Sequence, residues 1–364
     1  MTNREQEILA LLRTNPLISQ IELAQALGIT RSSAAVHITN LMKKGHILGK
    51  GYIVREDDYV CVIGGSNMDI QGFPNSELIY KDSNIGKVKM SLGGVGRNIA
   101  ENLVRMGIQT RLITVIGDDV YGNKILEEAR HIGLDMQDTL VLNGENTSTY
   151  LSILDHSMDM VLAISHMDIC ERMTVDYIKS KRHVIEHASL CVLDTNLPIE
   201  VIEYIVTTFK DTVFFLDTVS SAKAQKVKSL LGYFHTIKPN RIEAEILTGI
   251  KIKDISDLPK AAAVCHEKGV EQVFISLGDE GVYYSNKETS QIIKAPNVSI
   301  VNATGAGDAF LAALALGYVM QMNTGESAKL AVAASIIALS HENTINPLMS
   351  EETLFEKVKE LNLC

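Results

Sequence analysis

Short apolar runs alternate with longer stretches of helical periodicity along most of the chain. The runs are rich in β-branched residues and are apolar at consecutive positions, which is typical of strands buried on both faces of a parallel sheet. We predict such strands at residues 59–63, 109–116, 190–193, 213–216 and 272–276. The periodic stretches predict helices at residues 97–106, 123–131, 200–209, 241–247, 257–267 and 308–320. This order predicts an α/β fold, with a doubly wound, mostly parallel sheet covered by helices on both faces.

Two regions interrupt the alternation. The patterns at residues 87–91, and at 147–155 with 160–164, indicate antiparallel strands rather than strand–helix–strand units. We therefore expect a small β lid beside the main sheet, built from about residues 68–92 and 140–165.

The first 55 residues follow another pattern. Apolar residues recur at helical spacing from Ile8 to Leu12, Ser19 and Glu22 form a capping box for a second helix, and Thr30 can cap a third. Residues 47–54 read as a hairpin with glycines at its turn. Three helices and a hairpin resemble the winged helix-turn-helix of bacterial transcription regulators.

That resemblance implies DNA binding. The third helix would enter the major groove and the wing would reach a phosphate. The residues expected to contact DNA are Arg31, Ser32, Ser33, His37 and Lys50. The alternative is a small helical module that serves dimerisation and binds no DNA.

Charge separates the same two regions. The chain has 34 Lys and Arg against 44 Asp and Glu, a net charge of −10, which excludes a uniformly basic nucleic-acid coat. Residues 1–55 nevertheless carry seven basic and three acidic side chains, a net +4, which leaves −14 for the rest. We predict a domain boundary near Arg55, with a DNA-binding module at 1–55 and a larger domain at 56–364.

Composition narrows the class of protein. At 46% hydrophobic and 21% charged residues the chain is typical of a folded globular protein. Its five cysteines are scattered without a CxxC pair, which argues against a disulfide framework and a zinc site. The apolar stretches fall short of the roughly 20 residues that span a bilayer, so we expect a cytoplasmic protein that does not bind membranes.

The most informative loop precedes the predicted helix at 308–320. Its glycines allow backbone N–H groups to converge, and a helix N-terminus favours negative charge, so the sequence Thr304-Gly305-Ala306-Gly307-Asp308 can bind an anion. A carboxylate there would repel a phosphate unless it has another task. The pattern therefore indicates phosphoryl transfer, with Asp308 as the general base and the N–H groups of residues 305–308 as the anion hole. The plainer alternative is a helix cap after a flexible turn.

Two motifs together resemble the signatures of the ribokinase-like, or pfkB, carbohydrate and nucleoside kinases. Residues 93–100 (GGVGRNIA) are similar to the first signature, and residues 304–308 (TGAGD) are similar to the second. The resemblance extends from about Tyr59 to the C-terminus. It implies the family's fold, with ATP and Mg²⁺ as cofactors.

The resemblance also assigns roles to individual residues. Those expected to bind the sugar are Asn67, Asp69, Gly93, Gly94 and Asn98, with Thr149 and Asn196 near the base. Those expected to bind ATP are Asn240, Glu243, Ser276, Gly278 and Gly281, and Glu243 would orient a Mg²⁺-bound water. Asn302 and Thr304 belong to a loop that often holds a monovalent cation, K⁺, in this family. Taken singly, these residue types are equally typical of turns and helix starts.

Within the family, overall similarity is greatest to the pseudouridine kinases, for example in residues 144–150. This implies ATP-dependent phosphorylation of the ribose 5′-hydroxyl of pseudouridine. An inosine/guanosine kinase or a ribokinase is the alternative within the family. A transcription regulator that uses the kinase domain as a nucleoside sensor is the alternative of another class. Regulators of this type bind two-fold operators, so we expect a homodimer.

Overall fold

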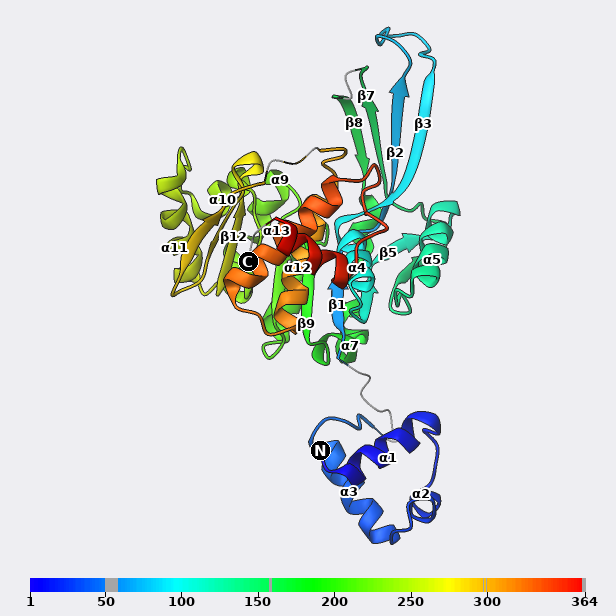
Figure 1. Ribbon diagram of the computed structural model, residues 1–364. Coiled ribbons are helices and arrows are strands. Elements are labelled where there is room, and N and C mark those ends of the chain that lie inside the picture. The colour runs from blue at the N-terminus through cyan, green and yellow to red at the C-terminus, as the bar shows by residue number, and fades with distance from the viewer. Residues whose placement is uncertain (50–57, 157–158, 297, 299, 362–364) are drawn as a thin grey trace. The chain divides into compact units, whose positions relative to one another are not determined.

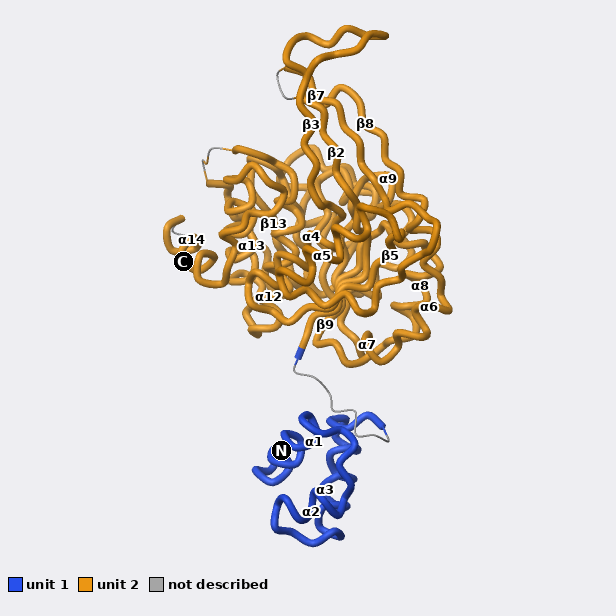
Figure 2. The backbone as a smooth tube through the Cα atoms, turned by 90° about the vertical axis from the view of Figure 1, so that its right-hand side faces the viewer, with its two compact units in different colours: residues 1–58 blue, residues 59–364 orange. Residues whose placement is uncertain are grey.

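The computed structural model describes residues 1–49, 58–156, 159–296, 298 and 300–361. The chain forms two compact units, residues 1–58 and residues 59–364 (Figure 2).

Unit 1 contains three helices, α1 (Asn3–Thr14), α2 (Gln20–Ala26) and α3 (Arg31–Lys43). The side chains of Ser19 and Thr30 cap α2 and α3 as predicted, since they accept the N–H groups of Glu22 and Ser33. One small core holds the helices together, formed mainly by Ile8, Leu12, Leu23, Ala34, Ile38 and Leu41. Lys50 and most of the predicted hairpin lie outside the described residues.

Unit 2 is built around an eight-stranded sheet in the order β14-β13-β12-β11-β10-β9-β1-β4 (Figure 1). The six strands from β4 to β12 in this order are parallel, and β13 and β14 are antiparallel additions. Their bounds are β1 (Val60–Ile63), β4 (Thr110–Ile113), β9 (Leu190–Asp194), β10 (Phe214–Asp217), β11 (Thr236–Ile237), β12 (Gln272–Ser276), β13 (Val282–Ser285) and β14 (Ser290–Ile293). All five predicted runs contribute a strand to this sheet.

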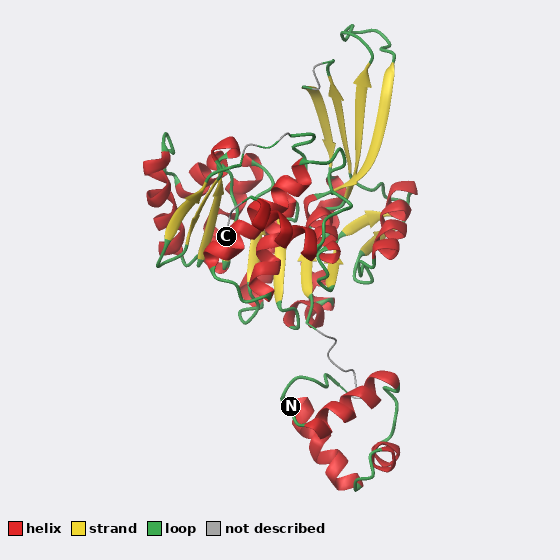
Figure 3. Ribbon diagram, in the orientation of Figure 1, coloured by secondary structure: helices red, strands yellow, loops and turns green. Residues whose placement is uncertain are grey.

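Helices cover both faces of the sheet (Figure 3). On one side lie α4 (Val95–Arg105), α5 (Val120–Ile132), α12 (Ala306–Val319), α13 (Thr324–Leu339) and α14 (Glu351–Glu360). The other side has α6 (Val175–Ser180), α7 (Arg182–Glu186), α8 (Ile199–Thr208), α9 (Ser221–Ala224), α10 (Arg241–Thr248) and α11 (Leu258–Lys268). Alternate residues of β1 enter the two cores, Cys61 and Ile63 on one side and Val60 and Val62 on the other. The predicted doubly wound α/β fold is confirmed.

The described residues of unit 2 also include four short 3₁₀ helices: η1 (Asp168–Arg172), η2 (Gln225–Tyr233), η3 (Ile255–Asp257) and η4 (Gly278–Glu280). Within the described ranges, no helix combines the length and apolar character needed to cross a membrane.

A second, four-stranded sheet projects from unit 2 as a lid (Figures 1 and 2). Its order is β3-β2-β7-β8, with bounds β2 (Asn67–Pro74), β3 (Gly86–Gly93), β7 (Thr149–Leu154) and β8 (Met160–His166). The antiparallel strands expected at 87–91, 147–155 and 160–164 correspond to β3, β7 and β8.

Three details differ from the sequence-based expectations. The strand β2 was not predicted, because its sequence NMDIQGFP lacks an apolar run or a clean alternation. The run at 109–116 forms two strands, β4 and β5 (Val115–Gly117), which belong to different sheets. The segment β6 (Leu140–Leu142) pairs with β5 rather than with the lid, so the second lid segment begins later than the predicted residue 140.

Candidate active site

Polar side chains gather where the parallel strands of the main sheet end. Asp194 and Asp217 are the last residues of β9 and β10, and these two strands pair so that Asp217 lies opposite Asp194. Asn240 follows β11, and it forms a bridge with Ser276 at the end of β12. In open α/β sheets, ligands bind at this carboxyl edge of the strands.

Asp308 reaches this edge from the first turn of α12. Gly305 precedes the helix with a φ of 83°, and a Cβ at this position would lie 2.2 Å from the carbonyl oxygen of Thr344. Only glycine fits such a close approach in the left-handed region. The helix begins at Ala306, two residues earlier than predicted, so Asp308 lies in its first turn, where the backbone N–H groups have no partner within the helix. The loop therefore places a carboxylate in the first turn of a helix, next to the N–H groups predicted to bind an anion.

The Asp308 side chain is 9% exposed, and its Oδ2 accepts a 2.8 Å hydrogen bond from Nδ2 of Asn98. Burial raises the pKa of Asp308 to about 8, and the nearby Asp217 carboxylate adds to the rise. The Asn98 hydrogen bond and the Lys238 ammonium act in the opposite direction and lower the pKa. A carboxylate with a pKa close to neutral pH is suited to accept and release a proton.

Lys238 supplies positive charge within this group of carboxylates. Its side chain is 12% exposed, and Nζ lies 3.2 Å from Oδ2 of Asp217. Burial lowers the pKa of Lys238, but the carboxylates of Asp217, Asp308 and Glu243 outweigh it, so the net shift is upward. A Cβ on Gly307 would lie 2.9 Å from the same Nζ, so the ammonium also lies beside the glycine loop.

The residues predicted to bind a sugar lie together at the base of the lid. Nδ2 of Asn67 donates a 2.6 Å hydrogen bond to Oδ1 of Asp69, and Asn67 pairs with Gly93 on the adjacent strand. A Cβ on Gly93 would lie 2.2 Å from Oδ2 of Asp69, so any larger residue would require the Asp69 side chain to shift. Burial raises the pKa of Asp69, while Asn67 and Arg97 partly offset the rise. The neighbouring Gly94 has a φ of 98°.

Two more predicted substrate residues lie near this region. Thr149 begins β7 and pairs with Met68 of β2, at the base of the lid. The N–H of Asn196 donates to Oδ1 of Asp194, and its Oδ1 accepts a hydrogen bond from Nζ of Lys223.

The predicted ATP residues form a second group along the same edge. Asn240 caps α10, and Oε2 of Glu243 accepts hydrogen bonds from the N–H of Asn240 (2.9 Å) and the hydroxyl of Thr218 (2.6 Å). Glu243 is therefore both part of a capping box and a buried carboxylate of the site. Gly278 and Gly281 adopt φ values of 67° and 107° around η4.

The two residues predicted to hold a monovalent cation bond to each other, and Asn302 also bonds to the loop that contains Glu342. Oδ1 of Asn302 accepts the N–H of Thr304 (2.9 Å), and Nδ2 donates to the carbonyl of Glu342 (3.0 Å).

Comparison with known proteins identifies the family. The profile of the pfkB family carbohydrate kinases matches residues 57–351. The chain belongs to the pfkB carbohydrate kinase family. A winged helix-turn-helix DNA-binding profile matches residues 1–47, so the predicted pair of modules is also confirmed.

Individual relatives of this pfkB kinase cover most of its length. The uncharacterized sugar kinase YeiI of Escherichia coli (strain K12) is 41% identical over 359 residues, which are 98% of this chain and 99% of YeiI. The pseudouridine kinase of the same strain is 40% identical over 298 residues, 82% of this chain and 95% of that enzyme. The fold is shared with Arabidopsis thaliana ribokinase complexed with ribose and ATP, with a TM-score of 0.75, 21% identity, and coverage of 84% of this chain and 99% of that one. Family membership makes the chain a phosphotransferase.

Three residues of the candidate site were not identified from the sequence: Asp194, Asp217 and Lys238. A signal was present, because Asp194 and Asp217 directly follow two predicted strands and Lys238 directly precedes the Pro239-Asn240 pair. Residues that follow parallel strands meet at one edge of the sheet, and this rule points to both carboxylates.

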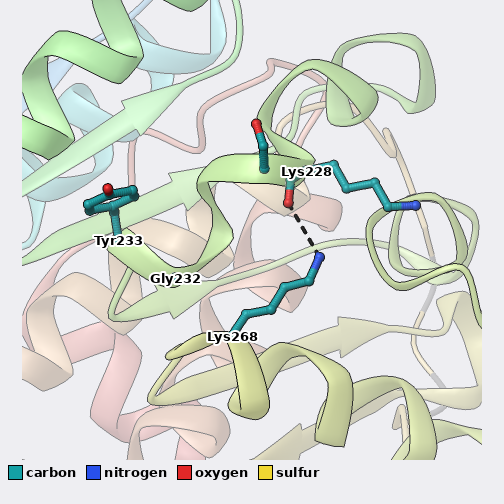
Figure 4. Close-up of a pocket in the computed structure, with 5 residues that line it drawn as sticks. Lys228, Gly232, Tyr233 and Lys268 are labelled. Carbon is teal, nitrogen blue, oxygen red and sulfur yellow. Dashed lines mark hydrogen bonds between the residues drawn. The ribbon is translucent and has the colours of Figure 1, made fainter.

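Unit 2 also has a surface hollow that lies away from the candidate site. It is lined by Lys228, Ser229, Gly232, Tyr233 and Lys268 (Figure 4). Tyr233 precedes β11 and Lys268 precedes β12, so the hollow lies at the amino edge of the sheet, opposite the candidate site.

Of the residues expected to contact DNA, Arg31, Ser32 and Ser33 lie in the first turn of α3 and His37 lies in its middle, whereas Lys50 is outside the described residues. Arg31 and Ser32 are exposed, whereas Ser33 and His37 are half-buried. The hydroxyl of Ser32 is also 3.0 Å from that of Thr30.

Proposed function

We propose that this pfkB kinase transfers the γ-phosphoryl group of ATP to the 5′-hydroxyl of pseudouridine, and that it does so in the cytoplasm. The observation that carries the reaction type is the buried Asp308 carboxylate within the N-terminal turn of α12. The choice of pseudouridine as the substrate is supported by the 40% identity to a pseudouridine kinase. The alignment with this chain includes 95% of that enzyme's length.

Asp308 acts as the general base in this proposal. Its carboxylate takes the proton from the 5′-hydroxyl as that oxygen attacks the phosphoryl group. The N–H groups of Gly305, Ala306, Gly307 and Asp308 stabilise the negative charge that develops on the phosphoryl oxygens. The Lys238 ammonium, beside Gly307 and Asp217, compensates charge at the same place.

The ribose lies against the base of the lid. Asp69 and the amides of Asn67 and Asn98 suit the hydroxyl groups of a ribose, and Gly93 and Gly94 allow the backbone close to it. Thr149 and Asn196 contact the base. An enzyme of this kind gains from a closing lid, which excludes water and protects ATP from hydrolysis.

Asn240, Glu243, Ser276, Gly278 and Gly281 form the ATP side of the site. Mg²⁺ prefers carboxylate oxygens and water as ligands, and Glu243 has a buried carboxylate. Within the described residues, Thr218 and Asn240 both donate to its Oε2, which leaves Oε1 to face a Mg²⁺-bound water. Bound Mg²⁺ would neutralise the phosphate charges of ATP, with Glu243 orienting one of its waters. Asn302 and Thr304 remain our prediction for a K⁺ site, and replacing K⁺ by Na⁺ in the assay tests it.

The direct test follows the product. Purified full-length protein is incubated with MgATP and pseudouridine, and ³¹P NMR identifies the position of the new phosphate. We expect pseudouridine 5′-phosphate from the wild type, and a rate of product formation lower by several orders of magnitude from Asp308→Asn under the same conditions. Phosphorylation of inosine, guanosine or free ribose in preference to pseudouridine would instead favour the alternatives within the family.

A second function is favoured by unit 1. The winged helix-turn-helix match and the net +4 of residues 1–55 support DNA binding by this module, with residues 56–364 as the kinase domain. A homodimer would match a two-fold operator, and the kinase domain would then also sense nucleosides. Fluorescence anisotropy with DNA upstream of the gene, at several salt concentrations and with or without pseudouridine, tests the regulator. Absence of binding at low salt would leave the enzyme alone.

A further inference from the structure

Arg97 is a buried arginine in the first turn of α4 that the proposed reaction does not yet use. Its side chain is 6% exposed. Nη1 donates a 3.2 Å hydrogen bond to Oδ1 of Asn98, the next residue in the chain. Nδ2 of the same amide donates 2.8 Å to Oδ2 of Asp308. The three side chains therefore form a chain of hydrogen bonds that ends on the proposed base.

The two ends of an asparagine amide are chemically different. The oxygen can only accept hydrogen bonds and the NH₂ group can only donate them. Arg97 can only donate, and the ionised Asp308 can only accept, so one orientation of Asn98 satisfies both neighbours. In the opposite orientation the amide oxygen would face the Asp308 carboxylate and the NH₂ group would face the guanidinium. Arg97 thus selects the orientation that presents a donor to Asp308.

Arg97 is itself firmly held. Its Nη2 pairs with Oε2 of Glu101, one helical turn later, and Oε1 of Glu101 is bound by Nε of Arg105 at 2.8 Å. The Glu101 side chain is 5% exposed. Buried, charge-paired guanidinium groups lose little freedom on forming a further hydrogen bond, which makes Arg97 a rigid support for Asn98.

We propose that Arg97 is a positioning residue for catalysis, which holds the Asn98 amide so that it donates to Asp308. This inference rests on the proposed function of Asp308 as base. The charged groups that face Asp308 from the other elements are Asp194 and Asp217 at the ends of β9 and β10, and Lys238 after β11. Asn98, unlike these groups, is neutral, so its effect on the Asp308 carboxylate depends on which end of the amide faces that carboxylate. Arg97 controls that orientation.

The test compares the titration of Asp308 in variants of the full-length protein. Protein labelled with ¹³C-aspartate is titrated by NMR without substrate, and Asp308→Asn identifies the Asp308 carboxyl signal. The variants are Arg97→Met, Asn98→Ala, the double variant of these two, and Arg97→Lys. Arg105→Met is the matched control, because it removes a partner of Glu101 and leaves Asn98 untouched. The pH dependence of kcat/KM is measured in parallel.

The hydrogen bond from Asn98 lowers the pKa of Asp308, so loss of this hydrogen bond must raise that pKa. We expect Arg97→Met to raise the pKa of Asp308 by about one unit, the value of one hydrogen bond to a charged group, and to move the acid limb of kcat/KM equally. Arg97→Lys should restore at least half of the shift, and Arg105→Met should cause none. In the Asn98→Ala background, Arg97→Met should add nothing, because Arg97 acts through Asn98.

Two results would overturn the proposal. One is an unchanged Asp308 titration in Arg97→Met, with folding verified by circular dichroism. The other is a shift that is equally large in the Asn98→Ala background. If Arg97→Met does not fold, the double variant Arg97→Met/Glu101→Gln takes its place in the same comparison. The second substitution removes the buried Glu101 charge that Arg97→Met leaves without its partner. A wild-type protein without kinase activity would refute the proposed function, while the NMR titration would still decide the role of Arg97.

Discussion

Replacing Asp308 with Asn should stabilise unit 2 while removing most of its activity. The wild-type carboxylate is 9% exposed, and burial with the nearby Asp217 raises its pKa from 3.8 to about 8. At about 1.4 kcal/mol per pKa unit, the full shift corresponds to roughly 6 kcal/mol of lost stability when the group is ionised. Asparagine carries no charge and can still accept the hydrogen bond of Asn98. Because Lys238 compensates part of the charge and the site relaxes, we expect a gain of about 2–4 kcal/mol at pH 8.

The gain must depend on pH with a definite sign. The pKa of Asp308 in the folded state is raised above its unfolded value, so the wild type loses stability as pH rises from about 4 to about 8. Near pH 4 the carboxyl is protonated in the folded protein and only about half ionised in the unfolded chain, so the variant and the wild type should be similarly stable. Since general-base catalysis contributes about 10²- to 10⁴-fold, kcat should fall by at least that factor.

Calorimetric unfolding of the full-length proteins at pH 4, 6 and 8 measures the effect. Asp168→Asn is the matched control, because that carboxylate is 93% exposed and its loss should leave the unfolding of unit 2 unchanged. A variant that is less stable than the wild type at pH 8, or a gain that is equal at pH 4 and pH 8, would refute the reasoning. Either result would mean that Asp308 is not a strained, buried carboxylate.

Three further predictions address the rest of the account. Gly305→Ala should lower kcat at least tenfold, because its Cβ would lie 2.2 Å from the Thr344 carbonyl oxygen. The control Gly133→Ala, at a similar φ of 79° but with open space around its Cβ, should only lower stability by about 1 kcal/mol of backbone strain. Normal turnover in Gly305→Ala would contradict the anion hole. Lys238→Met removes a charge that lowers the pKa of Asp308, so the acid limb of kcat/KM should move to higher pH, and an unmoved limb would exclude this coupling. Arg31→Ala should weaken DNA binding several-fold and reduce the salt slope by about one, with phosphoryl transfer unchanged; equal binding in anisotropy titrations would remove Arg31 from the interface.

Much of the fold could be predicted because its central strands are buried on both faces. Such strands appear in the sequence as apolar runs, as at 190–193 and 213–216. The lid strand β2 has no comparable signal, since Asn67–Pro74 is held as a strand by pairing with β3 on one side and β7 on the other. Pairing with two partners is a property of the folded chain and leaves no periodicity in one segment.

The site was predicted where a motif is contiguous, as in residues 304–308 and 93–98. The roles of Asp194 and Asp217 depend instead on the parallel register that places one opposite the other. The contact between Asn98 and Asp308 joins residues 210 positions apart. Spacing along the sequence cannot show such contacts, because they arise from the packing of α4 against α12.

The most direct test of the central claim is the ratio of kcat/KM values over a substrate panel. Purified full-length protein is assayed with MgATP and, separately, pseudouridine, uridine, inosine, guanosine and ribose. We predict that kcat/KM for pseudouridine exceeds that of every other acceptor by at least about tenfold, the discrimination that one well-placed polar contact to the base can provide. No transfer to pseudouridine, or a higher kcat/KM for another acceptor, would contradict the account.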